Sequence, residues 1–97
     1  MYLRMVIGEA VSADQVEEFG RIYREEVVPE IKEEPGFRSA RLIVEEGGTM
    51  AISLTEWSTR DDCLRYHSSR SYRRFVDRTQ HLLVGDFVVK LFQDCTT

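Results

Sequence analysis

The sequence predicts a single α+β domain of the ferredoxin-like type, in which a four-stranded antiparallel sheet carries helices on one face. Three observations predict this fold: a length of 97 residues, strand and helix patterns in the order βαββαβ, and a glycine turn between two strands in mid-chain. A chain of this length has room for one hydrophobic core. We therefore expect residues 1–97 to form one domain.

A strand and a helix make up the first part of the chain. Residues 2–11 alternate apolar side chains with other residues, which is the period of a β-strand. Ser12 and Gln15 have the spacing of a capping box, and residues 16–27 carry apolar side chains at three- and four-residue spacing. Pro29 disfavours helical geometry at the residue before it, so we expect the helix to end or kink there.

A hairpin occupies the middle of the chain. Residues 37–45 and 49–57 have strand character, and the glycines of residues 46–48 supply the positive φ angle that a tight turn needs. Ser58 or Thr59 then caps a second helical region.

The last part of the chain contains two consecutive helical pieces and a strand. Ser68 and Ser69 interrupt the helical pattern, and residues 87–92 form the last strand. With this strand the order βαββαβ is complete.

Sorting the strand residues by parity separates two faces of the sheet. One face is apolar throughout, and we expect the helices to cover it: Leu3, Met5, Ile7, Ala40, Leu42, Val44, Met50, Ile52, Leu54, Phe87, Val89 and Leu91. The other face is mixed: Tyr2, Arg4, Val6, Phe37, Ser39, Arg41, Ile43, Ser53, Thr55, Trp57, Val88, Lys90 and Phe92. A mixed, partly aromatic face predicts an interface or a ligand cavity.

Several short motifs carry a family resemblance. They are Glu34-Pro35-Gly36-Phe37, the hairpin that follows, and Glu56-Trp57-Ser58-Thr59 before a helix with Tyr66, His67 and Tyr72. On these residues nearly the whole chain resembles the antibiotic biosynthesis monooxygenase family of dimeric α+β barrels. The resemblance implies a homodimer in which two sheets face each other to form a barrel. The family contains cofactor-independent oxygenases, quinol oxygenases, haem-degrading enzymes and a sugar-phosphate isomerase, so the fold does not fix the reaction.

Residue by residue, the resemblance is incomplete. The helix position nine residues after Trp57, often histidine in the family, is Tyr66, and His67 comes one place late. The asparagine and histidine of the haem-degrading branch correspond to Ile7 and Val76, which disfavours haem degradation.

The candidate site residues divide into two groups. Tyr66 and His67 are the catalytic candidates, as a hydrogen-bond or proton donor and a general base. The substrate-binding candidates are Trp57 as an aromatic wall, Arg4 and Arg41 as cations for an anionic group, and Thr55 and Phe92. Each has a structural alternative: Trp57 in core packing, Tyr66 and His67 at the surface, and Arg41 in an ion pair with Glu56.

These candidates lead to a functional hypothesis. We expect a cofactor-independent monooxygenase that acts on a small phenolic or quinol-like substrate in a pocket between sheet and helices, without metal or flavin. A non-catalytic binding or stress-related dimer, or an isomerase of a small polar metabolite, remain alternatives. Cys63 and His67 have a spacing that can share a metal, but the sequence offers no third ligand.

Composition limits the other possibilities. Net charge is −4, and no nucleic-acid motif accompanies the arginines of the second helical region, so we exclude nucleic acid as a partner. No apolar run reaches the roughly 20 residues of a membrane-spanning helix. We therefore expect a cytoplasmic protein without a membrane partner, in which Cys63 and Cys95 are free thiols.

Overall fold

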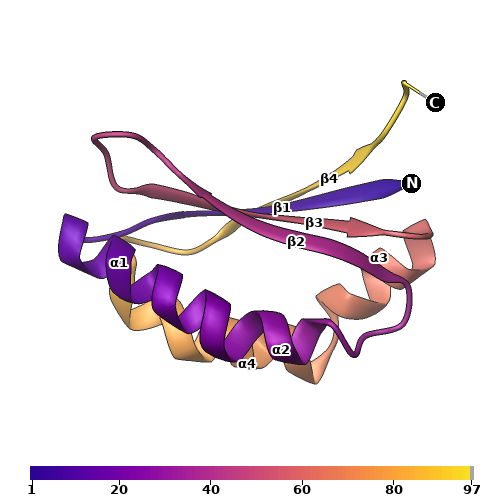
Figure 1. Ribbon diagram of the computed structural model, residues 1–97, viewed down its shortest axis with the longest axis horizontal. Helices are drawn as coiled ribbons and strands as arrows, with labels where there is room; N and C mark the ends of the chain where they lie inside the picture. Colours follow the sequence, from indigo (N-terminus) through magenta and orange to yellow (C-terminus); the bar gives the residue numbers. More distant parts are fainter. Residues whose placement is uncertain (97) are drawn as a thin grey trace.

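The computed structural model describes residues 1–96 and has the predicted ferredoxin-like architecture (Figure 1). The elements run β1 (Tyr2–Glu9), α1 (Ala13–Ile22), η1 (Tyr23–Val27), α2 (Val28–Ile31), β2 (Phe37–Val44), β3 (Met50–Trp57), α3 (Arg60–His67), α4 (Arg70–Thr79), η2 (Gln80–Leu82) and β4 (Val88–Gln93). The strands form one antiparallel sheet in the order β2-β3-β1-β4. Strand β1 thus lies in the interior of the sheet, between β3 and β4.

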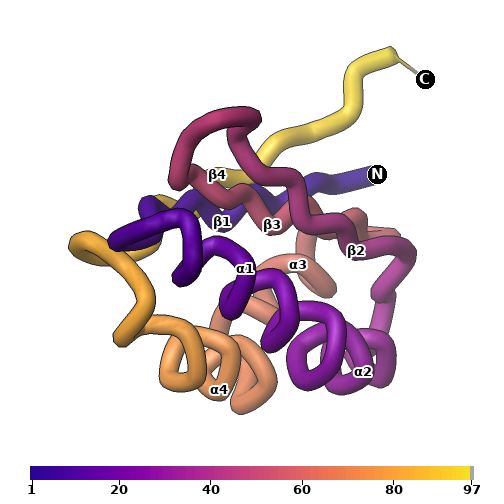
Figure 2. The backbone as a smooth tube through the Cα atoms, turned by 60° about the vertical axis from the view of Figure 1, so that its left-hand side comes forward, coloured from indigo at the N-terminus to yellow at the C-terminus, as the bar shows by residue number. Residues whose placement is uncertain are grey.

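All helices lie on the same side of the sheet, as Figures 1 and 2 show from two directions. The helices α1 and α4 run beneath the middle of the sheet, and α3 lies beneath the end at which β3 finishes. No helix or strand of residues 1–96 lies on the opposite side of the sheet. We call that side the open face.

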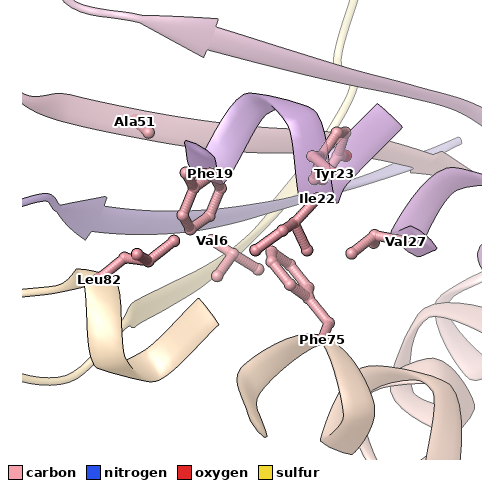
Figure 3. Packing of buried hydrophobic residues seen from close by; sticks show 8 residues of the cluster. All are labelled: Val6, Phe19, Ile22, Tyr23, Val27, Ala51, Phe75 and Leu82. Carbon is pink, nitrogen blue, oxygen red and sulfur yellow. The ribbon is translucent and has the colours of Figure 1, made fainter. Parts of the chain in front are cut away.

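The main core lies between the sheet and the helices α1 and α4 (Figure 3). It consists of Val6, Phe19, Ile22, Tyr23, Val27, Ala51, Phe75 and Leu82, each at most 5% exposed. Phe75 is central because its ring contacts those of Phe19 and Tyr23 at centroid distances of 5.9 and 5.7 Å. Edge-to-face contacts of this kind add stability beyond the burial of apolar area.

The prediction of which face the helices cover was wrong for β1 and β3. Residues paired directly across strands share a face, and Arg4 pairs with Thr55 while Val6 pairs with Ser53. All four are buried beneath the helices. Parity failed because the polar side chains of Arg4, Ser53 and Thr55 lie on the side that the helices cover, and because a bulge between Phe37 and Ser39 shifts the alternation in β2.

The open face also carries many apolar side chains. Its apolar residues are Leu3, Met5, Ile7, Ile43, Met50, Ile52, Leu54, Val88 and Phe92. Ile43, Val88 and Phe92 are 48%, 51% and 42% exposed. The prediction was right for β4 and most of β2, since Leu42 and Val89 pack against the helices.

Of the two outcomes predicted at Pro29, an end or a kink, the structure excludes an end of the first helical region. It continues to Ile31, and the turn before the proline widens into the π-helical segment η1. In this segment the Val28 N–H donates to the carbonyl of Tyr23, five residues earlier. The predicted capping box is also absent, because Ser12 is the N-cap residue but its side chain makes no capping bond.

The turns follow the sequence prediction closely. Gly47 has φ of 73° in the hairpin between β2 and β3, a conformation that glycine adopts without steric cost. Ser68 and Ser69 separate α3 from α4, as expected.

Candidate active site

The most unusual side chain of the protein is Arg4, which projects from β1 toward the helices. Its exposed fraction is 0%, and none of the ion pairs among residues 1–96 includes it. The Nη2 atom contacts Nδ1 of His67 at 2.9 Å, whereas Nε and Nη1 are buried with no hydrogen-bond partner in the described part of the chain. A buried cation with orphaned donors is costly unless an anion or acceptor joins it.

Two tyrosine rings enclose this guanidinium. The Cζ atom of Arg4 lies 4.1 Å from the ring centroid of Tyr72 and 5.1 Å from that of Tyr66. Cation–π attraction offsets part of the cost of burying the charge. The rings supply no acceptor in the guanidinium plane, so Nε and Nη1 are still free to bind one.

An aromatic cluster continues from Tyr66 toward the end of β3. The rings of Trp57 and Tyr66 are stacked, with centroids 4.9 Å apart and planes 25° apart, and Phe37 packs edge-on against Trp57. The Trp57 indole donates to Oγ1 of Thr55 at 2.9 Å, and that hydroxyl faces the Arg4 carbonyl at 3.4 Å. Thr55 therefore holds Trp57 in place next to the strand that bears Arg4.

Burial changes the acid–base behaviour of two of these groups. Tyr66 is 1% exposed, and burial raises the pKa of its hydroxyl well above its ordinary value even though the Arg4 charge opposes the shift. The hydroxyl stays protonated near neutral pH and acts as a donor, not as a base. Burial likewise raises the pKa of the Cys63 thiol, which lies in the same cluster and is unreactive in that form.

His67 forms the outer boundary of the site. Its ring stacks on that of Tyr72 at a centroid distance of 5.5 Å, and its Nδ1 accepts from Arg4. Burial, and then the charge of Arg4, lower the pKa of the imidazole from its ordinary value of 6.5. Because Nδ1 accepts a hydrogen bond, the neutral ring carries its proton on Nε2.

Two helix caps position these side chains. The N–H of Asp62 donates to Oγ1 of Thr59, which starts α3 directly after β3 and brings Tyr66 beneath Trp57. The N–H of Tyr72 donates to Oγ of Ser69, which starts α4 and directs Tyr72 over Arg4. The capping hydroxyl groups of Thr59 and Ser69 thus fix where the two helices that carry Tyr66 and Tyr72 begin.

Not all predicted site residues come together. Arg4, Thr55, Trp57, Tyr66 and His67 form one site, and with Tyr72 we call them the Arg4 site. Arg41 and Phe92 lie on the open face, opposite Leu54 and Leu3 respectively, and are exposed.

The sequence did not single out three side chains that the fold brings close to this site. Tyr72 was named among the residues that carry the family resemblance but not as a site residue, yet its ring is the nearer of the two to Arg4. The Tyr23 hydroxyl and Ser53 Oγ are 2.7 Å apart in the core. Burial raises the pKa of Tyr23, and the bond to Ser53 and then the charge of Arg4 oppose this shift. The sequence did place Arg4 and Ser53 on the same face of neighbouring strands, and this was the one indication that they lie close together.

Two surface hollows lie near the helices. One of about 830 Å³ separates α1 from the edge strand β2 and is lined by Glu17, Arg21, Leu42 and their neighbours. The other, of about 250 Å³, lies where α3 meets α4 and is lined by His67, Ser68, Ser69, Tyr72, Arg73, Val76 and Asp77. We call the second the junction hollow, and only it shares residues with the Arg4 site.

Residues 1–96 contain no cluster of three or more histidine, cysteine or carboxylate side chains that could hold a metal ion. Within the same residues, no helix is long and apolar enough to cross a membrane.

Comparison with known proteins gives one family and many structures of the same fold. The model of the antibiotic biosynthesis monooxygenase family matches residues 3–78. No curated protein matches the sequence significantly.

Solved structures of low sequence identity share the fold over almost the whole chain. A monooxygenase of Streptomyces coelicolor, solved with nanaomycin D, is 15% identical with a TM-score of 0.86, covering 99% of this chain and 88% of that one. The cofactor-independent oxygenase SnoaB of Streptomyces nogalater is 15% identical with a TM-score of 0.81, covering 99% and 94%. A further antibiotic biosynthesis monooxygenase is 18% identical with a TM-score of 0.78, covering 97% and 98%.

Proposed function

Because the chain belongs to the antibiotic biosynthesis monooxygenase family, we propose that it is a cofactor-independent monooxygenase that oxidises a small phenolic or quinol-like substrate in the Arg4 site. The observation that carries the proposal is the guanidinium of Arg4, fully buried among tyrosine rings with two nitrogen atoms lacking partners. Such a group stabilises an oxygen anion on a bound aromatic molecule. The fold shared with a cofactor-independent oxygenase supports the same reaction class.

The reaction needs no external reductant. A methylene group between aromatic rings reacts as R₂CH₂ + O₂ → R₂C=O + H₂O, so the substrate supplies every electron that oxygen accepts. The substrate first loses a proton, and the resulting anion then passes an electron to oxygen. The protein has to promote the proton loss, stabilise the anion and exclude water.

The residues of the Arg4 site divide these tasks. Arg4 pairs with the oxygen that becomes negative, and Tyr66, which stays protonated, donates a hydrogen bond to a second oxygen. His67 accepts the proton of the substrate once the incoming oxygen has replaced its Nδ1 on Arg4. Trp57 forms the apolar wall, with Thr55 holding its indole.

A second candidate is a non-catalytic protein that binds a small molecule in the same place. One observation favours it: Trp57, Tyr66 and Cys63 are at most 1% exposed, and the Trp57 and Tyr66 rings are already stacked. A planar substrate would have to move one of them to lie between the rings. A binding protein needs no oxygen access and tolerates such close packing.

We also propose that the protein acts as a homodimer. The open face carries apolar side chains on all four strands, interspersed with Arg41, Glu56 and Lys90. A contiguous apolar patch on a monomer marks an interaction site. A second copy of the same face would cover it, and a stable dimer of this kind buries at least about 1,200 Å² in total.

The oxygenase proposal is tested by Tyr66→Phe, which removes one hydroxyl and keeps the stacked ring. We expect oxygen consumption with anthrone-like phenols and quinols to fall roughly 10- to 1,000-fold, the effect of losing one donor to an oxyanion. Tyr2→Phe is the matched control, since it removes a tyrosine hydroxyl at the edge of the aromatic cluster. Its rate should stay within about twofold of the original, and both melting temperatures should change little.

Two outcomes count against the oxygenase. Unchanged oxygen uptake in Tyr66→Phe removes this hydroxyl from the mechanism. An absence of uptake across the panel, together with ligand-induced melting shifts, favours the binding protein.

A further inference from the structure

The junction hollow lies directly outside Arg4. Its volume is about 250 Å³, and its lining includes His67 and Tyr72. These are the side chains that contact the guanidinium, His67 through Nδ1 at 2.9 Å and Tyr72 through its ring at 4.1 Å. One layer of side chains therefore separates the buried cation from a hollow at the surface.

His67 is the part of this layer that can move. It is the last residue of α3, it is exposed, and the backbone leaves helical geometry at Ser68. Tyr72 lies inside α4 and packs against Tyr66 and Phe75 at centroid distances of 5.6 and 6.0 Å. A rotation of the imidazole away from Tyr72 opens a path to Arg4 without moving the core.

The charges around the hollow favour an anion. Arg4 lies behind it, Arg73 lines it, and the ten-residue helix α4 starts beside it at its N-cap residue Ser69. Asp77 is the single carboxylate of the lining. The unpartnered guanidinium is fully buried, so an arriving anion meets a charge that water does not screen.

We propose that the ligand of the Arg4 site is a small aromatic carboxylic acid that enters through the junction hollow and binds Arg4 with its carboxylate in place of Nδ1 of His67. The aromatic part of this inference rests on the proposed function, and the acid group rests on Arg4 itself. The two oxygens of a planar carboxylate match two N–H groups of the guanidinium, and the ring of the ligand takes the position of the imidazole on Tyr72.

A permanent charge fits this site better than a neutral phenol. A neutral ligand leaves a buried cation without a counter-ion, whereas a carboxylate neutralises it on arrival. Pockets for drug-sized molecules measure about 300–1,000 Å³. The hollow, even with the space of one imidazole added, is at the small end of this range, so we expect a ligand of one or two fused rings.

Calorimetric titration tests the charge requirement. The probes are 1-hydroxy-2-naphthoate and its neutral analogue 1-hydroxy-2-naphthamide, which differ only in the acid group. We expect the acid to bind at least about tenfold more tightly, as for a charge-assisted pair in a desolvated site. Arg4→Met should reduce this preference to about twofold or less, while Arg38→Met, which removes an exposed arginine of β2, should keep it.

Nitrogen NMR of the two histidines tests the route without any variant. Adding 1-hydroxy-2-naphthoate should move the Nδ1 resonance of His67, because its bond to Arg4 is replaced, and should leave that of His81 unchanged. This measurement also keeps the proposal testable if Arg4→Met does not fold. Inorganic phosphate serves as a third probe, and phosphate that shifts His67 as strongly as the aromatic acid would identify a general anion site and overturn the proposal.

The outcomes separate this inference from the oxygenase proposal. Equal binding of acid and amide, or a preference that survives in Arg4→Met, refutes the aromatic acid and leaves oxygen uptake with neutral phenols possible. Selective binding of the acid without oxygen uptake supports the inference and refutes the oxygenase.

Discussion

Replacing Arg4 by methionine should leave the ligand-free protein as stable as before or make it more stable. Methionine is unbranched and apolar and can pack its thioether near the rings of Tyr66 and Tyr72, but it carries no charge and no donor. In most proteins a buried arginine is fully paired, and truncating it costs about 3–5 kcal/mol because its partner is left charged. Here the orphaned atoms belong to Arg4 itself, so they disappear with it.

The magnitude follows from the contacts of the guanidinium. Removing the two orphaned nitrogens, Nε and Nη1, gains about 1–3 kcal/mol each. Against this, the ring contacts at 4.1 and 5.1 Å are lost, at a cost of about 2 kcal/mol for the nearer one and less for the other. The hydrogen bond to His67 contributes about 1.5 kcal/mol or more, and contacts between sulfur and the rings recover part of the loss. We expect a net change between about zero and a gain of 2 kcal/mol.

Urea unfolding at fixed protein concentration measures this change. Trp57 is the only tryptophan and is 0% exposed, so its fluorescence reports the loss of the site directly. A gain of 1 kcal/mol corresponds to a rise in melting temperature of roughly 4–8 °C for a domain of this size. A loss of more than about 2 kcal/mol in Arg4→Met would show that Arg4 is a structural residue and would refute the interpretation of its free donors as a binding site.

Three further predictions concern the surroundings of the site and the open face. The pKa of His67 is lower in the folded protein than in the unfolded chain, so the unfolded chain takes up a proton first as pH falls. The contribution of the neutral imidazole to stability is therefore complete above pH 6.5 and is lost as pH falls through the lower folded-state pKa. His67→Gln should reduce the dependence of the urea midpoint on pH just below pH 6.5. Thr55→Val leaves the Trp57 indole without an acceptor and should cost about 1–3 kcal/mol, and an unchanged urea midpoint would contradict that hydrogen bond. Ile52→Asp places a charge in the middle of the open face and should convert a dimer into a folded monomer, as judged by light scattering beside circular dichroism; a monomeric mass for the original protein would already exclude the dimer.

The order of elements was predictable because each boundary has a local chemical cause. Gly47 takes the positive φ of the hairpin, and Thr59 and Ser69 cap the two later helices through their own hydroxyl groups. These are interactions between residues at most three positions apart, and the sequence displays them directly. The same cannot hold for Pro29, whose place in a helix depends on a widened turn just before it.

The direction of the sheet faces was not predictable by parity. The rule assumes that the apolar side of a strand is the buried one. In β1 that side, with Leu3 and Met5, is the open face, while Arg4 and Thr55 are buried. A sheet with apolar residues on both sides breaks the assumption, because its two sides differ in what covers them and not in their polarity.

The sequence predicted the aromatic part of the site but not the contact between Arg4 and His67. Trp57 and Tyr66 stand out as large aromatics at a strand end and on the following helix, and the fold stacks them. The contact between Arg4 and His67 joins residues 63 positions apart, and nothing local indicates it. It depends on how α3 packs against β1, which a sequence pattern does not specify.

The π-helical segment η1 affects how the helix keeps its place along the sheet. An α-helix turns once in about 3.6 residues, so side chains four residues apart advance around the axis by about 40° at each step. Tyr23, Val27 and Ile31 are spaced in this way, and all three are at most 3% exposed. The wider turn of η1 takes up this rotation, so one helix reaches the main core at Tyr23 and Val27 and the aromatic cluster at Ile31.

Chain length is consequently constrained very differently in two neighbouring regions. In the hairpin, Gly47 has open space around it, and an added residue would extend into solvent. In the regular helix α1, loss of one residue would turn everything after it by about 100° and withdraw Tyr23 and Val27 from the main core. Relatives of this protein should therefore vary in length at the hairpin and keep a constant count within α1.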